Sequence, residues 1–243
     1  IAIIWYCRRK GIRIVHLLDA FGPTLMIAYA VGRIGCQVAG DGDWGIYNSA
    51  YITDSSGKVV LAQGDDFRNK LKEHETYFLK GTVATATGGE TMVTDRISAS
   101  LDEVPHRSFK APKFLPVWMV AYNYPHNVNE DGVLLPDCDG DYCRALPLPV
   151  FPTPFYELTA CFILFLVLWA LRKKIKVPGV LFSLYLIFTG VERFLVETIR
   201  VNTKYSFWGL QPTQAELISF LLVIIGIIGI VFFTSMHKRK IVW

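Results

Sequence analysis

The sequence holds few of the side chains that commonly bind metals, with five cysteines and five histidines among its 243 residues. Cys138 and Cys143 lie close together, but neither a histidine nor a second cysteine pair is near them, so zinc is weakly supported. Residues 137–143 and 127–132 also fail as calcium loops. The first has Tyr142 where a glycine is needed, and the second has Cys138 at its closing position. We therefore expect no metal centre.

The start of the chain lacks the features of a signal peptide. It has no initiator methionine and no basic segment ahead of the apolar residues 1–7. These residues resemble the end of a helix that begins before residue 1. We therefore expect the chain to be incomplete at its N-terminus.

Apolar side chains, in contrast, make up 52% of the residues. They gather in four segments that approach or reach the roughly 20 residues needed to cross a bilayer. The four segments are 19–39, 153–171, 178–200 and 213–235. Thr213 followed three residues later by Glu216 predicts a capped start for the last of them. The pattern indicates an all-α polytopic membrane protein.

Basic residues are concentrated beside these segments and predict the orientation of the chain. The clusters lie at 8–13, 172–176 and 237–240, and the positive-inside rule assigns all of them to the cytoplasm. Residues 41–152 and 201–212 then lie outside. The 41–152 segment holds 16 acidic against 10 basic residues, which is consistent with translocation. Because the basic residues act as topology signals, we expect no nucleic-acid partner.

The long segment between the first two spans is predicted to form an extracytoplasmic arm that is mostly β or irregular. Alternating and β-branched residues with intervening turn signals occur at 46–55, 58–63 and 76–87. We divide the chain into a membrane part at 1–45, the arm at 46–149 and a membrane part with three spans at 150–243. The outer side permits disulfides, so Cys138 and Cys143 are candidates for one.

Ionisable residues occur inside two of the apolar segments. Each costs about 3 kcal/mol or more in a membrane unless it is paired, hydrated or bound to a charged ligand. The 178–200 segment carries Arg193, Glu197 and Arg200 at i, i+4 and i+7, which places them on one helix face. A functional cluster is one interpretation, and an intrahelical Arg193–Glu197 ion pair at the membrane rim is the other.

The second unusual segment is 31–45, which combines Arg33 with a run of glycines. Glycine lets a ligand approach the backbone, and arginine offers a rigid fork of donors to phosphate. The alternative is close helix packing, with Arg33 extending toward the interface. Glu157 near the start of the next span completes the charged set, although a carboxylate there also suits a helix N-terminus.

These residues carry a resemblance to a known family. Residues 31–45, VGRIGCQVAGDGDWG, resemble the signature G-R-x-G-N-F-x-x-G-E-x-x-G of the prolipoprotein diacylglyceryl transferases. The family segments P-x-x-x-Y-E and E-R-F-x-x-E-x-x-R are similar to PTPFYE at 152–157 and ERFLVETIR at 192–200. The likeness covers about 8–45 and 150–235, and the arm matches nothing in the pattern.

The resemblance implies a bacterial inner-membrane enzyme that moves a diacylglyceryl group from phosphatidylglycerol to the lipobox cysteine of a preprolipoprotein signal peptide, without a cofactor or metal. It places Arg33, Arg193 and Glu197 in the catalytic set. Substrate-binding positions are Gly35, Cys36, Gly40, Asp41, Asp43, Gly45, Tyr156, Glu157 and Arg200.

Three departures from the family pattern matter. Cys36 replaces an asparagine, and either Asp41 or Asp43 stands for the glutamate of the turn. A His-Gly-Gly stretch is expected before residue 1, so the catalytic base stays open.

Two other functions compete with this interpretation. Buried Arg/Glu pairs also mark the pathways of transporters or flippases for anionic or lipid-linked solutes, although no internal repeat is found. A membrane-anchored binding module, with its activity in 46–149, is the second.

Overall fold

A computed structural model describes residues 2–79, 82–84, 90–92, 100–200 and 213–239. The chain forms two compact units, which are described separately. Unit 1 comprises 1–34, 155–198 and 204–243, and unit 2 comprises 35–154 with 199–203. The expected outer segment at 201–212 lies outside the described residues.

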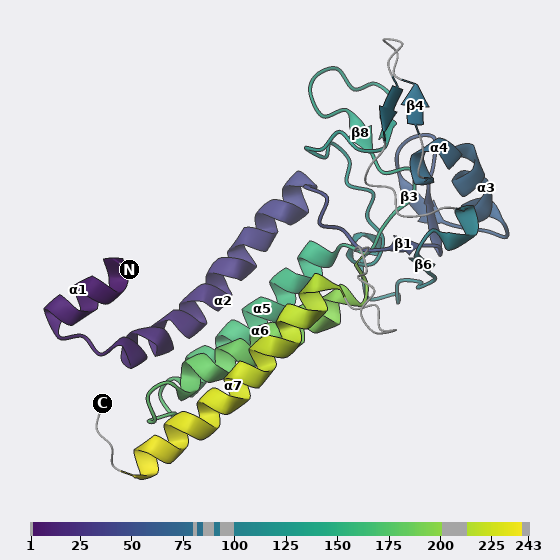
Figure 1. The fold of residues 1–243 in the computed structure, drawn as a ribbon. Helices are drawn as coiled ribbons and strands as arrows, with labels where there is room; N and C mark the ends of the chain where they lie inside the picture. Colours follow the sequence, from purple (N-terminus) through teal and green to yellow (C-terminus); the bar gives the residue numbers. More distant parts are fainter. Residues whose placement is uncertain (1, 80–81, 85–89, 93–99, 201–212, 240–243) are drawn as a thin grey trace. The chain divides into compact units, whose positions relative to one another are not determined.

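Unit 1 contains the long helices (Figure 1). The helices, two of which begin or end in unit 2, are α1 (Ala2–Lys10), α2 (Ile14–Ala39), α5 (Thr153–Leu171), α6 (Val180–Glu197) and α7 (Gln214–Lys238). Of these, α2, α5 and α7 are long and apolar enough to cross a membrane. Helix α6 forms where the remaining span was expected, but its 18 residues hold three charged side chains, more than an 18-residue stretch of the other three helices carries. Unit 1 is therefore mostly helical, in agreement with the predicted class.

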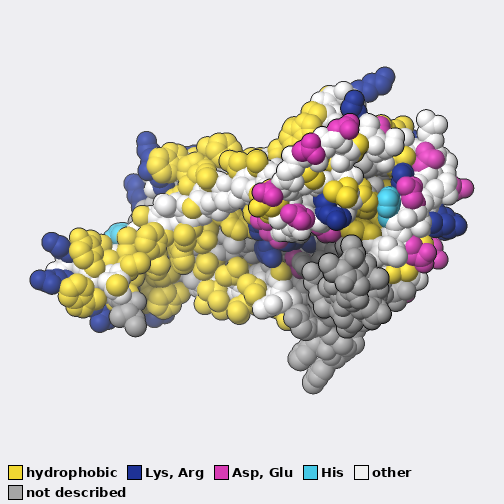
Figure 2. All heavy atoms as spheres, turned by 90° about the horizontal axis from the view of Figure 1, so that it is seen from above, with side chains coloured by type: hydrophobic (Ala, Val, Ile, Leu, Met, Phe, Trp, Pro, Cys, Tyr) yellow, Lys and Arg dark blue, Asp and Glu magenta, His cyan; other side chains and the backbone are white. Residues whose placement is uncertain are grey.

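Three helices of unit 1 share one hydrophobic core. Met26 and Ala30 of α2 pack with Cys161 and Leu168 of α5 and with Leu181 of α6. Large apolar side chains face outward on the same helices, and Figure 2 shows them covering the visible face of the helical unit. Outward apolar surface of this extent is the arrangement that a lipid environment stabilises.

Helices α6 and α7 approach each other closely through glycine. A Cβ at Gly190 would lie 2.7 Å from the backbone oxygen of Ser219, and one at Gly226 would lie 2.7 Å from that of Ser183.

Helix α7 begins at the predicted capping box. Glu216 N–H donates to Thr213 Oγ1 at 3.2 Å, and Thr213 N–H donates to Glu216 Oε2 at 2.9 Å. Both contacts hold the polar end of an otherwise apolar helix.

Unit 2 is built from short strands, turns and small helices. Its strands are β1 (Tyr47–Asn48), β2 (Tyr51–Thr53), β3 (Val59–Leu61), β4 (Thr82–Ala84), β5 (Glu90–Met92), β6 (His106–Arg107), β7 (Val133–Leu134) and β8 (Arg144–Ala145). Its helices are α3 (Asp66–Glu73) and α4 (Glu75–Phe78), with 3₁₀ turns at Leu101–Glu103 and Val117–Met119. The strands pair two by two: β1 with β6 in parallel, and β2–β3, β4–β5 and β7–β8 antiparallel.

The sequence prediction for this unit is partly wrong. A strand was expected across 76–87, but the beginning of that range belongs to α4, and α3 was not expected at all. Phe67 and Leu71 of α3 are buried with Phe78 and Leu148, so packing of an apolar helix face outweighs the local β pattern. The expected turn at 55–58 does form, with Asp54 accepting hydrogen bonds from Ser56 and Lys58.

Two polar devices hold the irregular parts of unit 2. Asn48 is fully buried and donates to the carbonyls of Phe109 and Val120, while its Oδ1 accepts from the backbone of Ala50 and Phe109. Cys138 and Cys143 are joined by a disulfide across the loop they bound. A saturated buried amide and a covalent link stabilise segments that have little regular structure.

Candidate active site

Buried Arg33 and Glu157 form a polar cluster in unit 1 with Tyr29, whose side chain is partly open at 37% exposure. Tyr29 donates from its hydroxyl to Glu157 Oε2 at 2.5 Å, and Arg33 Nη2 donates to the same hydroxyl at 2.6 Å. Arg33 Nε also makes an ion pair with Glu157 Oε2. Glu157 is 0% exposed and Arg33 is 9% exposed. Charge-assisted contacts thus join the three side chains among apolar helices.

The helix period explains how α2 builds its half of this cluster. Tyr29 and Arg33 are four residues apart, so they lie on the same face, and the guanidinium is 4.8 Å from the tyrosine ring centre. Met26 and Ala30 bury the adjoining surface against α5. Arg33 is therefore held inside the helical unit, and the expected alternative of an arginine extending to the interface does not describe it.

Glu157 supplies the other half from the second turn of α5. The alternative of a simple carboxylate at a helix N-terminus is inadequate, because this side chain is fully buried and ion-paired to Arg33. Tyr156, its neighbour, is half-buried and packs edge to face on Phe155 at 6.2 Å. An uncompensated carboxylate at this depth would cost several kcal/mol, so the pairing with Arg33 also stabilises the folded protein.

Helix α6 contributes acidic side chains to the interior of unit 1. Glu192 is 5% exposed and Glu197 is 4% exposed. Cys161 of α5, one turn after Glu157, lies within electrostatic range of Glu157, Glu192 and Arg33. This brings Glu192 to the same side of the bundle as the cluster.

Arg193 and Glu197 do not form the intrahelical pair that was the alternative interpretation. Among the residues that the structure describes, no ion pair joins them, and Arg193 is half-buried while Glu197 is buried. The buried face of α6 carries Gly190, Glu192 and Val196, so Arg193 lies at its edge. Both candidates remain on α6, but at different depths.

Unit 2 holds a second charged pair, between Arg200 and Asp43. The side chain of Arg200 is 10% exposed and that of Asp43 is 34% exposed. Backbone contacts fix both segments: Ile46 N–H donates to the oxygen of Ile199 at 2.9 Å, and Thr153 Oγ1 donates to the oxygen of Asp43 at 2.5 Å. The structure places Arg200 beside the glycine-rich turn, in a different unit from Arg33 and Glu157.

The two aspartates of the turn differ in environment. Asp41 is exposed, whereas Asp43 is partly buried and ion-paired. Oxygen or sulfur atoms of Cys36, Asp41 and Asp43 lie within 4.8 Å of one another, a spacing that suits a cation. The Asp43 carboxylate is already engaged by a guanidinium, which disfavours a second positive charge there. Of the two open candidates, Asp43 has the environment of a binding residue.

The glycines of this turn fall into distinct classes. A Cβ at Gly45 would lie 2.8 Å from the oxygen of Ile199, and Gly40 has φ +63° with its Cβ position 2.8 Å from Cβ of Asn127. Both are required by packing. Gly35 in α2 has nothing within 4 Å of that position, so packing does not explain it.

Sequence reasoning assigned no site role to Tyr29 and Glu192. The signal for Tyr29 was available, because it lies one helical turn before Arg33 and a hydroxyl there can bridge an arginine to an acid. Glu192 follows the apolar part of α6 directly, and the sequence shows it only as one more charged residue of that segment. Its burial depends on how α6 rotates against its neighbours, which periodicity alone does not give.

Comparison with known proteins identifies a family for this chain. The prolipoprotein diacylglyceryl transferase family matches residues 1–232. A phosphatidylglycerol–prolipoprotein diacylglyceryl transferase of Chlorobaculum tepidum is 35% identical over 92 residues, 36% of this chain and 32% of the relative. One of Symbiobacterium thermophilum is 32% identical over 82 residues, 34% of this chain and 30% of the relative. The matched part thus spans about a third of the length of these relatives.

No solved structure matches this chain. The family match extends over nearly all of the sequence, including both charged helices and the glycine-rich turn. The chain therefore belongs to the prolipoprotein diacylglyceryl transferase family.

Proposed function

We propose that this chain transfers a diacylglyceryl group from phosphatidylglycerol to the cysteine thiol of a prolipoprotein lipobox. The observation that carries the proposal is the buried pair of Arg33 and Glu157 with Tyr29 bonded to both. A guanidinium in an apolar helical unit suits a substrate with an anionic head group and lipid tails. Family membership supplies the reaction class.

The transfer forms one bond and breaks another. The cysteine thiolate attacks the carbon of the diacylated glycerol that bears the phosphate. A carbon–sulfur bond forms there, and the bond between that carbon and the phosphate oxygen breaks. Glycerol phosphate leaves with the bonding electron pair, and the thiol proton passes to a base. The thiolate is the nucleophile, and cations stabilise the departing phosphate.

Arg33 is assigned to the phosphate of the lipid. Tyr29 and Glu157 fix its orientation, so the guanidinium binds the phosphodiester in one geometry rather than many. Glu157 also keeps the site neutral before the lipid enters. Arg193 and Glu197 on α6 are assigned to the glycerol part of the head group.

Family resemblance also assigns substrate binding to residues of unit 2. Arg200 is held there by Asp43, and the turn from Gly35 to Gly45, including Cys36, Gly40 and Asp41, offers its backbone to a ligand. In unit 1, Tyr156 is assigned to substrate binding as well. The proposed location is the bacterial inner membrane, with the lipobox peptide arriving at its outer face.

Two variants of Arg33 test whether this residue binds the lipid phosphate. Arg33→Ala in the full-length protein is expected to lower the transfer rate by about 30-fold to several thousand-fold, because losing a charged, hydrogen-bonded contact costs roughly 2–5 kcal/mol. Arg33→Lys restores little, since a point charge does not replace the fork. The assay is lipidation of a lipobox peptide with phosphatidylglycerol, measured as the increase in mass of the peptide.

Arg68→Ala is the matched control, because the Arg68 side chain is 68% exposed and pairs only loosely with Asp102 at 3.6 Å. It should keep the wild-type rate. A wild-type transfer rate for Arg33→Ala, in a variant shown to be inserted and folded, would contradict the assignment of Arg33 to the lipid head group. It would favour transport of an anionic or lipid-linked solute instead.

A further inference from the structure

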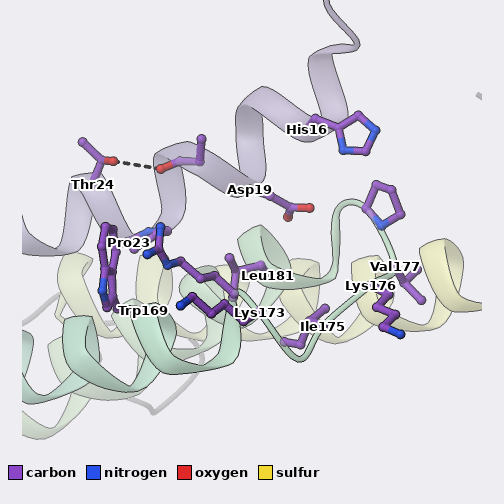
Figure 3. Close-up of a pocket in the computed structure, with 13 residues that line it drawn as sticks. His16, Asp19, Pro23, Thr24, Trp169, Lys173, Ile175, Lys176, Val177 and Leu181 are labelled. Carbon is purple, nitrogen blue, oxygen red and sulfur yellow. Dashed lines mark hydrogen bonds between the residues drawn. The ribbon is translucent and has the colours of Figure 1, made fainter.

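A cavity with a basic side lies in unit 1, away from the Arg33 cluster. It has a volume of about 580 Å³ and is formed by the first half of α2, the end of α5, the turn at 172–178 and the start of α6 (Figure 3). Along α2, Asp19 of this pocket precedes Arg33 by about 21 Å of helix rise. The pocket is therefore separate from the proposed active site.

One side of this pocket is basic. Arg172, Lys173 and Lys176 line it, and Figure 3 shows Lys173, from the turn after α5, on the same side of the pocket as Trp169. The guanidinium of Arg172 stacks on the ring of Trp169 at 3.3 Å from its centre. Stacking restricts this side chain and keeps a fork of donors beside the cavity.

The acid in the pocket is engaged in another role. Asp19 Oδ2 accepts from Gly179 N–H at 2.7 Å and Asp19 Oδ1 accepts from Phe182 N–H at 2.9 Å, so it caps α6. No ion pair joins it to a basic residue within the described part of the chain. The three cations exceed the single carboxylate, and the pocket carries net positive charge.

The other walls are apolar. Ala20 and Pro23 of α2 face Ile175, Val177 and Leu181 across the cavity. Inorganic phosphate has no apolar part to bury against such walls, whereas the glycerol and first methylenes of a lipid bury apolar surface there. A cationic rim, a tryptophan and apolar walls beside membrane-length helices match the chemistry of a phospholipid.

We propose that this pocket binds the head group of an anionic phospholipid at the end of the helical unit that carries the basic clusters. Arg172, Lys173 and Lys176 hold the phosphodiester, and the apolar walls receive the glycerol and upper acyl chains. The lipid would add a link between α2, α5 and α6 beside the Asp19 cap and the 172–178 turn. This site does not depend on the proposed transfer reaction and is distinct from its substrate site.

Lipid retention measured on the full chain tests this site. The purified protein is titrated with dioleoyl phosphatidylglycerol in detergent, and bound lipid is counted by native mass spectrometry. The pocket variant is Arg172→Gln with Lys173→Gln and Lys176→Gln. Its matched control is Arg8→Gln with Arg9→Gln and Lys10→Gln, which removes the same charge from exposed positions of α1.

The pocket variant should retain about tenfold less lipid, because each basic residue next to an anionic lipid contributes a few-fold to binding. The α1 variant should stay within about twofold of wild type. Ala20→Trp, which fills the pocket without changing charge, should also lower retention and covers the case in which the triple variant misfolds. The pocket variant and Ala20→Trp should keep the rate of lipobox-peptide lipidation within about twofold of wild type, which separates the site from the active site.

Three results would overturn the proposal. Equal loss in both triple variants would reduce the effect to general surface attraction. Full retention by the pocket variant and by Ala20→Trp would place the lipid elsewhere. Displacement of the lipid by excess glycerol phosphate or inorganic phosphate alone would identify a site for small anions rather than for a lipid.

Discussion

At the residue scale, the central feature is one arginine stabilised by one tyrosine and one glutamate. A buried ion pair repays its desolvation only when further hydrogen bonds satisfy its atoms, and Tyr29 supplies such a bond to both partners. The cluster is therefore a fixed unit rather than two flexible charges. A change that keeps both charges but removes the hydroxyl isolates its contribution.

Tyr29→Phe is that change. Hydrogen bonds to charged groups contribute about 1.5–3 kcal/mol, so the transfer rate is expected to fall by roughly 10- to 150-fold through misorientation of Arg33. Steady-state lipidation of a lipobox peptide measures it. Tyr185→Phe in α6 is the control, because the Tyr185 hydroxyl makes no hydrogen bond within the described residues. Equal rates for Tyr29→Phe and Tyr185→Phe would show that the bridge has no role in transfer.

At the element scale, the glycine-rich turn and the helix before it serve different ends. Gly45 is pressed against the backbone of Ile199 and Phe151, which ties the start of unit 2 to the segment after α6. Gly35 stands on α2 with open space at its Cβ position. The same residue type is therefore a packing requirement at one site and a candidate for ligand approach at the other.

Alanine at these two positions should separate stability from function. Gly45→Ala is expected to destabilise the protein by about 1–3 kcal/mol, because its Cβ overlaps backbone atoms that cannot move aside freely. Gly35→Ala should keep or raise stability by up to about 1 kcal/mol, since alanine favours helix. Thermal unfolding in detergent reports both. If Gly35→Ala keeps its melting temperature but loses lipidation, ligand approach explains that glycine. A melting temperature unchanged by Gly45→Ala would contradict the packing role.

At the scale of the whole molecule, the distribution of charge predicts how the chain crosses the membrane. The basic clusters flank helices of unit 1, while acidic residues predominate in 41–152. Figure 2 shows acidic side chains gathered on the visible face of unit 2. We expect unit 2 on the outer side and both chain ends in the cytoplasm.

Cysteine labelling in intact cells tests this orientation. Glu130→Cys, in an exposed loop of unit 2, should react with a membrane-impermeant maleimide added outside, and Lys174→Cys, in the turn after α5, should react only after the cells are opened. The unsubstituted protein is the blank for its own free cysteines. Labelling of Lys174→Cys in intact cells would reverse the predicted topology.

Several features followed from the sequence because they depend on composition and short spacing. Helix length and apolarity predicted the membrane helices, the Thr213–Glu216 spacing predicted the cap of α7, and the signature around Arg33 indicated the family. These properties are local or additive, so no knowledge of three-dimensional packing was needed.

The tertiary structure decided which charges meet. Helix rotation determines that Arg33 contacts Glu157 through Tyr29, that Glu192 is buried, and that Arg193 is not paired with Glu197. The short helices of unit 2 form for a similar reason, because Phe67 and Leu71 gain burial only against residues distant in sequence such as Leu148. Long-range packing selects among local alternatives of nearly equal energy, and that selection cannot be read from neighbouring residues alone.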